Sequence, residues 1–299
     1  MNISIIERDD GICHIVLEGH FDSTATEAIR EQLAGATSGR GQNAIVDLSG
    51  VDFLASRGIG LLFFNGKRMK SAGQQLVILR PQELVESVLK TSRVEHLIPI
   101  LHDLDEAITL LGGVTSELGG QTGERLQDVA RAYTTDPLAS AASKSQTVKV
   151  SIRNDLAELP GLNETLDEFM RAHEIPHRAT YAIKLAIDEL VVNVISYAFV
   201  DDDPHTIEVE LAIEPGQIVL RIEDDGRPFD PRTGPTLDLH AEDREPGGLG
   251  LLLVLDMVDV LKYRREADKN LVEIRVHLNA ETESDNPSSG EQSHVESTD

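Results

Sequence analysis

The sequence predicts a two-domain α/β protein in which helices and a β-sheet pack as layers in each half. Its 299 residues are enough for two domains that each bury a core. Short strand patterns alternate with helical patterns in both halves, which is typical of helices that cover a sheet. Between residues 113 and 145 this periodicity is lost, and glycine pairs and an alanine- and serine-rich run replace it. We therefore expect a domain at 1–112, a linker at 113–145 and a second domain at 146–280.

The chain is strongly acidic, with a formal net charge of −25 at pH 7. Residues 146–280 contain 27 acidic side chains against 14 lysines and arginines, and the tail at 281–299 has six acidic residues and no lysine or arginine. This balance argues against nucleic acid as a direct partner, because phosphate contacts need clustered basic side chains. The tail has one large aliphatic residue, Val295, so we expect it to be disordered.

Cysteine content and hydropathy point to the cytoplasm. The single cysteine, Cys13, excludes an intrachain disulfide, and its apolar strand pattern predicts a core residue rather than a reactive thiol. The beginning of the chain lacks the basic region of a signal peptide, and no apolar run approaches the length of a membrane span. We expect a cytoplasmic protein with no membrane contact.

The first half has the pattern of a largely parallel or mixed sheet covered by helices. Asp22 or Ser23 is expected to cap its first helix. Pro81 is expected to open a later helix, where its missing N–H costs nothing. The predicted strands are 3–7, 12–19, 44–48, 75–79 and 97–101, and the predicted helices are 24–33, 61–73, the segment from residue 81, and 103–111.

The run at 47–60, DLSGVDFLASRGIG, resembles the signature loop of STAS domains, the fold of anti-sigma-factor antagonists. In that family the loop carries a hydroxyl that accepts phosphate. Here Ala55 and Arg57 replace the usual aspartate and second hydroxyl residue, whereas Ser56 and Gly58 remain. The resemblance makes Ser56 the candidate phospho-acceptor. Ser56 also stands where the following helix needs an N-cap, and both interpretations remain open.

The second half combines strand pairs with three helices. A long uninterrupted helix follows Pro176 and extends to about Phe199. Glu189 and Asn193 lie one turn apart on one face of this helix, so a carboxylate and an amide can face one ligand, although a solvated polar stripe has the same pattern. The predicted strands are 147–152, 206–213, 217–222, 260–266 and 270–278, and the other two helices are 155–173 and 251–258.

Two further motifs follow this helix in the chain. Asp224 and Gly226 form Asp-x-Gly after a strand, and Gly247, Gly248, Leu249 and Gly250 form a glycine-rich loop that opens a helix. Each motif alone is weak, because such sequences are usually turns. Together and in this order, with a polar stretch between the last two, they resemble the ATP site of the GHKL (Bergerat) ATPases. The resemblance covers about residues 146–280 and implies the α/β sandwich of histidine-kinase-type ATPase domains.

The resemblance also implies a role for each motif. Asp224, with Gly226, would accept a hydrogen bond from the adenine amino group. The backbone N–H groups of residues 247–250 would bind the phosphates of ATP. Asn193 would hold Mg²⁺, and Glu189 would be the general base.

Within this superfamily the runs DDGRPFDP at 224–231 and PGGLGL at 246–251 are most similar to the anti-sigma-factor serine kinases. Pro228 and Tyr197 depart from the usual residues, and the segment around Asn270 lacks a common glycine-threonine element; these departures concern turnover more than binding. A histidine kinase fits less well, since the STAS-like domain takes the place of a dimerising helical hairpin. Chaperone and mismatch-repair ATPases fit less well still, because they carry large transducer domains.

These resemblances imply a partner-switching regulator of transcription that fuses an anti-sigma antagonist to an anti-sigma kinase. It would bind Mg-ATP and phosphorylate a serine, either Ser56 in cis or its equivalent on a separate STAS protein, with ATP and Mg²⁺ as cofactors. The alternative is a nucleotide-dependent binding switch without phosphoryl transfer. The expected partners are a sigma factor, a separate STAS or anti-sigma protein and the chain's own STAS-like domain. A homodimer is left open.

Overall fold

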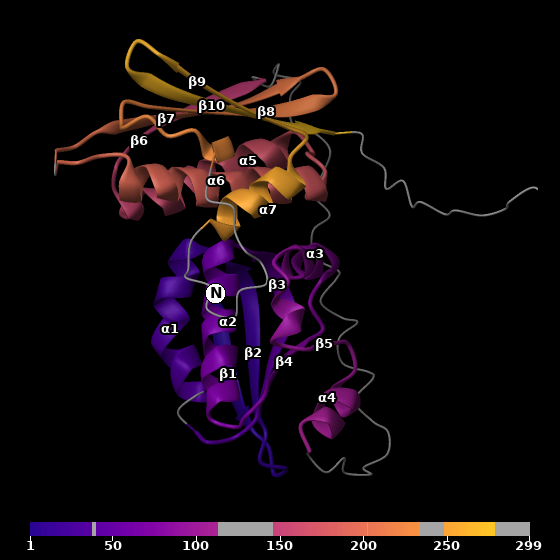
Figure 1. Cartoon of the computed structure of the whole chain (residues 1–299). Helices are drawn as coiled ribbons and strands as arrows, with labels where there is room; N and C mark the ends of the chain where they lie inside the picture. Colours follow the sequence, from indigo (N-terminus) through magenta and orange to yellow (C-terminus); the bar gives the residue numbers. More distant parts are fainter. Residues whose placement is uncertain (38–39, 113–145, 202, 234–247, 279–299) are drawn as a thin grey trace, which may run out of the picture.

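The computed structural model describes residues 1–37, 40–112, 146–201, 203–233 and 248–278 (Figure 1). The predicted linker at 113–145, the tail at 281–299 and most of the polar stretch before the glycine-rich loop lie outside the described residues. Within the described part the chain forms two five-stranded sheets, one in each half, and each carries helices.

The N-terminal domain is built on a mixed sheet with the strand order β1-β2-β3-β4-β5. β1 and β2 are antiparallel, and β2 to β5 run parallel, as the sequence predicted for a mixed sheet. The strands are β1 (Asn2–Glu7), β2 (Cys13–Phe21), β3 (Ala44–Leu54), β4 (Leu76–Leu79) and β5 (Ile100–Leu101), and the helices are α1 (Ser23–Thr37), α2 (Ser56–Ser71), α3 (Glu83–Thr91) and α4 (Leu104–Leu110), with a short 3₁₀ turn η1 (Val94–His96).

Alternating side chains place the core on both faces of this sheet. Val46 and Ile78 pack in the cluster that contains α1 and α2, whereas their neighbours Ile45 and Val77 pack in a smaller cluster against α4. A strand that is buried on both faces reads as a continuous apolar run, which is why 44–48 was recognisable. Cys13 is buried, as expected, with its pKa raised by burial.

Two local expectations were wrong. β3 does not end at residue 48 but continues to Leu54, because it stays paired with β2 through Phe21 across a bulge. Pro81 does not open a helix: α3 begins at Glu83, and Gln82 is its N-cap. In the first helix Asp22 is the cap, since its Oδ1 accepts the Ala25 N–H at 2.7 Å.

The C-terminal domain has an antiparallel sheet with the strand order β6-β7-β8-β10-β9. Its three helices lie on one face, between this sheet and the N-terminal domain (Figure 1). The strands are β6 (Thr147–Arg153), β7 (Thr206–Glu214), β8 (Gln217–Asp224), β9 (Val260–Glu266) and β10 (Lys269–His277), the helices are α5 (Leu159–Ala172), α6 (His177–Tyr197) and α7 (Leu249–Met257), and the 3₁₀ turns are η2 (Leu156–Glu158) and η3 (Pro231–Thr233).

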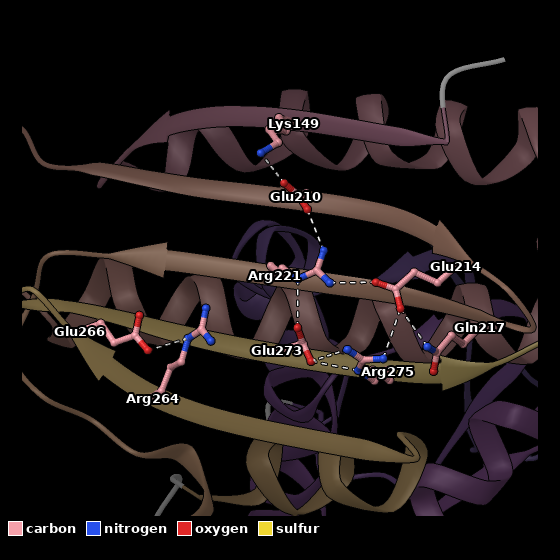
Figure 2. A network of polar contacts seen from close by, with 9 residues as sticks. All are labelled: Lys149, Glu210, Glu214, Gln217, Arg221, Arg264, Glu266, Glu273 and Arg275. Carbon is pink, nitrogen blue, oxygen red and sulfur yellow. Dashed lines mark hydrogen bonds and ion pairs between the residues drawn. The ribbon is translucent and has the colours of Figure 1, made fainter. Parts of the chain in front are cut away.

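The opposite face of this sheet carries a network of ion pairs (Figure 2). Arg221 on β8 lies at the centre and donates to Glu210, Glu214 and Glu273 at 2.8, 2.9 and 3.0 Å. Arg275 on β10 bridges the last two of these carboxylates. The sheet therefore has one core face, which binds the helices, and one charged face.

The two domains meet along α6 and α7, and one cluster of buried apolar side chains extends through both of them. Tyr181 on α6 is buried, and its hydroxyl both accepts from the N–H and donates to the carbonyl of Leu54, at 3.2 and 3.1 Å. Its ring packs on Phe53 with centroids 5.0 Å apart. At the rim, Thr91 on α3 donates to Asp256 on α7 at 2.9 Å. The end of β3 and the beginning of α2 are thereby held against α6.

Candidate active site between the two domains

Helix α6 positions the carboxylates at the centre of the site. Its apolar stripe, which includes Ile183, Ile187 and Leu190, is buried as the periodicity predicted. Glu189, however, is only 8% exposed, so the interpretation of its face as a solvated stripe is wrong. The domain interface buries Glu189, and the sequence of the helix alone could not reveal that interface.

Glu189 accepts two hydrogen bonds from Ser56 in the other domain. The Ser56 N–H donates to Oε1 at 2.8 Å, and the Ser56 hydroxyl donates to Oε2 at 2.7 Å. Ser56 is the first residue of α2, not its cap: Ala55 holds the N-cap position and has no capping side chain. The expectation that Ser56 caps the helix is therefore wrong. Glu189 satisfies an N–H group that has no partner within the helix.

Burial, followed by the neighbouring Asp188 carboxylate, raises the pKa of Glu189 to about 7, while the hydrogen bonds from Ser56 oppose the shift. A carboxyl group with such a pKa exchanges a proton readily near neutral pH. Since its Oε2 already accepts the Ser56 hydroxyl, Glu189 is placed to remove that proton.

Asp188 makes a second contact of the same form, which the sequence did not predict. The N–H of Ser23, the first residue of α1, donates to Asp188 Oδ1 at 3.1 Å, and the Ser23 hydroxyl donates to Oδ2 at 2.7 Å. Asp188 is 5% exposed, and burial raises its pKa to about 6. No motif marked this pair, because its two members lie 165 residues apart, and a serine is ordinary at the beginning of a helix.

Asp224 is the last residue of β8 and lines a separate cavity. Its Oδ1 accepts the Gly226 N–H and the Asn270 amide, both at 2.8 Å, and burial raises its pKa. Among the contacts of the described residues, both hydrogen bonds of this carboxylate fall on Oδ1, which leaves Oδ2 for a donor from a ligand. Asn270, which sequence reasoning noted only for a missing neighbour, fixes the orientation of Asp224.

Gly226 permits the chain to approach the end of α6. A Cβ on Gly226 would lie 2.5 Å from Cβ and 2.9 Å from the carbonyl oxygen of Ala198, distances that backbone and a short side chain cannot relieve. The glycine of the Asp-x-Gly motif is therefore required by packing as well as by any ligand. The adjacent Arg227 N–H donates to the same carbonyl oxygen at 2.9 Å.

The cavity beside Asp224 has a volume of about 290 Å³ and combines an apolar lining with a few amide and carboxylate groups. Such a site fits a flat heteroaromatic base that stacks on aliphatic side chains and donates one hydrogen bond at its edge. Asn193 lines the same cavity one turn of α6 beyond Glu189. Its lining residues include Leu190, Val194, Ile222, Phe229 and Val272.

The glycine-rich loop leads into α7, whose first turn lies against Glu189. Gly248 is the N-cap, with φ of 76°, a left-handed conformation that favours glycine. A Cβ on Gly250 would lie 1.9 Å from Glu189 Oε2, so only glycine fits there. Leu249 is buried in the core, and Gly247 lies outside the described residues. The N-terminus of α7, Glu189 and Ser56 therefore meet at one point.

A larger cavity, of about 450 Å³, lies where the N-terminal domain meets α5 and α6. Among the described residues, its lining takes none from β8, β10 or α7, so it does not contain Asp224 or Asn193. Lys184 at its wall pairs with Asp167 at 2.9 Å and lies over the Phe53 ring. Of these two cavities, the smaller one is lined by the sequence-predicted residues Asp224 and Asn193.

Two family models match the chain, one in each domain. The STAS domain matches residues 4–107, and the histidine kinase-like ATPase domain matches residues 152–276. The serine/threonine-protein kinase BtrW of Bordetella bronchiseptica is 30% identical over 102 residues, which are 33% of this chain and 72% of that protein. The chain belongs to the histidine kinase-like ATPase family. It adds a STAS domain ahead of the ATPase domain.

Other relatives match one domain each. The serine-protein kinase RsbW of Listeria monocytogenes is 33% identical over 92 residues, and the chain spans 59% of the length of that protein and uses 29% of its own. A solved anti-sigma-factor antagonist (STAS) domain protein from Planctomyces limnophilus is 20% identical over 37% of this chain and 98% of that one, with a TM-score of 0.34. Among the described residues, no helix is long and apolar enough to span a membrane.

Proposed function

We propose that the ATPase domain of this chain is a serine kinase that transfers phosphate from Mg-ATP to Ser56 of its own STAS domain. The observation that carries the proposal is the 2.7 Å hydrogen bond from the Ser56 hydroxyl to Glu189 Oε2. It joins the candidate acceptor on one domain to the candidate base on the other. The kinase relatives and the ATPase family support the same reaction class.

The proposed step balances without any further reactant. Glu189 takes the proton of the Ser56 hydroxyl as a bond forms between Oγ and the γ-phosphorus of ATP. The bond from the γ-phosphorus to its bridging oxygen breaks, and ADP leaves. Because burial raises the pKa of Glu189 to about 7, its carboxylate is a stronger base than an exposed glutamate, yet remains largely ionised above that pH.

The ATP substrate would occupy the 290 Å³ cavity with its adenine against Asp224. Its phosphates would extend toward the N-terminus of α7, where free N–H groups and the positive end of the helix dipole attract anions. Asn193 lies between these two regions on α6 and would provide one oxygen ligand for Mg²⁺, an ion that keeps waters and phosphate oxygens as its other ligands.

The test is a radiolabel transfer from Mg·ATP to the purified full-length chain, followed by phosphosite mapping. We expect label on Ser56, none at that site in Ser56→Ala, and at least a hundredfold slower transfer in Glu189→Gln. A rate constant independent of protein concentration would identify transfer in cis. Equal labelling in wild type and Ser56→Ala would overturn the proposal.

A nucleotide-dependent binding switch without transfer is the second candidate. The observation that favours it is the closed contact itself, because buried Glu189 already accepts both the N–H and the hydroxyl of Ser56 across the domain interface. In this case ATP would change the affinity between the domains, and Glu189→Gln would leave that response intact. The radiolabel experiment separates the two candidates.

As a regulator the chain would act in the cytoplasm by exchanging partners. A separate STAS or anti-sigma protein, or a sigma factor, would compete for the surface of α6 and α7 that the STAS domain of the chain covers here. Tethering favours the internal domain, because it gives an effective concentration of about 1 mM. A modification that weakens the internal contact would release the surface for the external partner.

A further inference from the structure

The contact between Asp188 and Ser23 plays no part in the proposed transfer, although it is as buried as the contact that does. We infer that Asp188 is a positioning residue, which grips Ser23 at the beginning of α1 and thereby holds the STAS domain in the orientation that presents Ser56 to Glu189. The expected effect of Asp188 on the rate of transfer rests on the proposed function. Its role in holding the STAS domain rests on the geometry alone.

The geometry of the two contacts is the same. Asp188 and Glu189 are consecutive on α6, and each accepts the N–H and the hydroxyl of the serine that begins a helix of the other domain. α1 and α2 pack against each other, so their N-termini face α6 side by side. The Ser56 contact and the contact of Tyr181 with Leu54 both hold the end of β3 and the beginning of α2, whereas the Ser23 contact holds α1. Contacts on both of these adjacent helices fix the direction of the STAS domain.

The Asp188 contact is selective for a docked domain that presents a hydroxyl group. Asp188 is 5% exposed, and its carboxylate accepts two hydrogen bonds from one serine in place of hydrogen bonds from water. If the serine hydroxyl is removed, Oδ2 loses a partner in a place where water enters poorly. The surrounding charges do not compensate: Asp22 and Glu189 repel the Asp188 carboxylate, while Arg57 attracts it. A docked domain must therefore present a hydroxyl at this point.

Positioning matters because phosphoryl transfer depends on alignment. Small displacements of an acceptor can cost about a hundredfold in rate even when the reacting groups are intact. The Ser56 hydroxyl carries one rotatable bond, so its direction depends on the placement of the whole of α2. Asp188 sets that placement by holding Ser23 on α1, a residue that takes no part in the proposed transfer.

The experiment uses the full chain and three variants: Ser23→Ala, Ser23→Thr and Asp188→Asn. We expect Ser23→Ala and Asp188→Asn to slow single-turnover phosphorylation of Ser56 by about 10- to 100-fold, with ATP affinity unchanged within twofold. Ser23→Thr keeps the hydroxyl and should retain most of the rate. Because the two partners act through one contact, the double variant should be no slower than the slower single variant.

The matched control is Thr91→Ala, which removes the exposed contact of Thr91 with Asp256 at the rim of the same interface. It should leave the rate unchanged within about threefold. Melting temperatures measured in parallel show that every variant is folded. A rate for both Ser23→Ala and Asp188→Asn equal to that of the control would overturn the inference.

A second readout does not depend on catalysis. The Ser23 and Ser56 amides both donate to α6, so their hydrogen exchange without nucleotide reports docking directly. We expect Asp188→Asn to speed exchange at both amides at least tenfold. If wild type places no phosphate on Ser56, the proposed function fails while this readout still decides the role of Asp188. Unchanged exchange at the Ser56 amide would overturn it.

Discussion

At the scale of single residues, the pKa of Glu189 gives the proposed reaction a pH dependence. The residue must be ionised to accept the Ser56 proton, and burial raises its pKa to about 7. We therefore expect the single-turnover rate to rise about tenfold per pH unit below pH 6.5 and to level off above pH 7.5. Asp256→Asn, at the rim of the interface, should keep the same profile. A rate that does not change between pH 6 and pH 8 would exclude Glu189 as the base.

Asp224 and Asn193 give a second prediction at this scale. Replacing Asp224 by Asn removes an acceptor that faces a donor in a semi-buried site, a loss of about 1–3 kcal/mol. We expect at least tenfold weaker Mg-ATP binding in Asp224→Asn and in Asn193→Ala, measured by calorimetry. Asp225→Asn is the matched control, because this neighbour faces His205 at 3.2 Å rather than the cavity. Unchanged affinity in both test variants would refute the proposed ATP site.

At the scale of elements, the charged face of the C-terminal sheet depends on Arg221 (Figure 2). This side chain joins three strands by donating to Glu210 on β7, Glu214 at the end of β7 and Glu273 on β10. Its removal leaves three partly buried carboxylates close together, whereas an isolated exposed pair contributes little.

We expect Arg221→Met to lower the free energy of unfolding by about 1–3 kcal/mol in low salt. Arg264→Met is the control, because Arg264 is exposed and, within the described part of the chain, forms an ion pair with Glu266 alone, at 3.6 Å. Its effect should stay within about 0.5 kcal/mol. Urea denaturation at two salt concentrations measures both. Equal effects of the two substitutions would show that the network adds nothing beyond single pairs.

The elements also show how far sequence patterns reach. The periodicity that predicted α6 is a local property, so it located the helix and its buried stripe well. β3 extended beyond residue 48 because its pairing partner, β2, is distant in sequence and allows a bulge. The pairing partner decides how far a strand continues, and the apolar run of the strand itself does not predict that length.

The candidate site also contains residues that the sequence predicts and contacts that it does not. Glu189, Asn193, Asp224 and the glycines are recognisable because each motif is compact in sequence. The meeting of Glu189 with Ser56 followed only from the resemblance of each domain to its family, and the contact of Asp188 with Ser23 was not predicted; the two contacts join residues more than 130 positions apart. They arise from docking of two complete domains, which no local pattern encodes.

At the scale of the whole molecule, the buried carboxylates link domain docking to pH. In the docked chain burial chiefly raises the pKa of Glu189 from 4.5 to about 7 and that of Asp188 from 3.8 to about 6, and the contacts with the N-terminal domain supply part of that burial. The charged groups that face them are Asp22, Arg57 and each other. The docked state therefore holds more protons than the undocked state between about pH 4 and pH 7.

This linkage fixes the sign of the expected effect. The contribution of the two groups is fully present below their undocked pKa values and is lost as pH rises through about 7, with a slope of up to about 1.4 kcal/mol per pH unit for each group. We expect the Ser23 and Ser56 amides to exchange less readily at pH 5.5 than at pH 7.5, after correction for intrinsic exchange. The variant with both Asp188→Asn and Glu189→Gln should lose this dependence. Greater corrected protection at the higher pH would contradict the assignment.

The last prediction concerns release of the STAS domain. A phosphate on Ser56 adds about two negative charges at an interface that already contains Asp188 and Glu189. Like charges at hydrogen-bonding distance repel strongly where water is excluded, so phosphorylation should open the contact between the domains. Ser56→Asp is a partial mimic of this state. Ser56→Ala keeps the N–H that donates to Glu189 and should stay closed.

Small-angle scattering of the full chain with Mg·ATP measures the opening. We expect a larger radius of gyration for Ser56→Asp than for wild type treated with a phosphatase, and an unchanged value for Ser56→Ala. Ser71→Asp is the matched control, because Ser71 lies exposed at the other end of α2, where its hydroxyl donates to the Lys67 carbonyl of the same helix. The same added charge there should leave the domains docked. If Ser56→Asp and Ser71→Asp give the same scattering profile, charge at the interface does not control release, and the external partner must displace the STAS domain by competition alone.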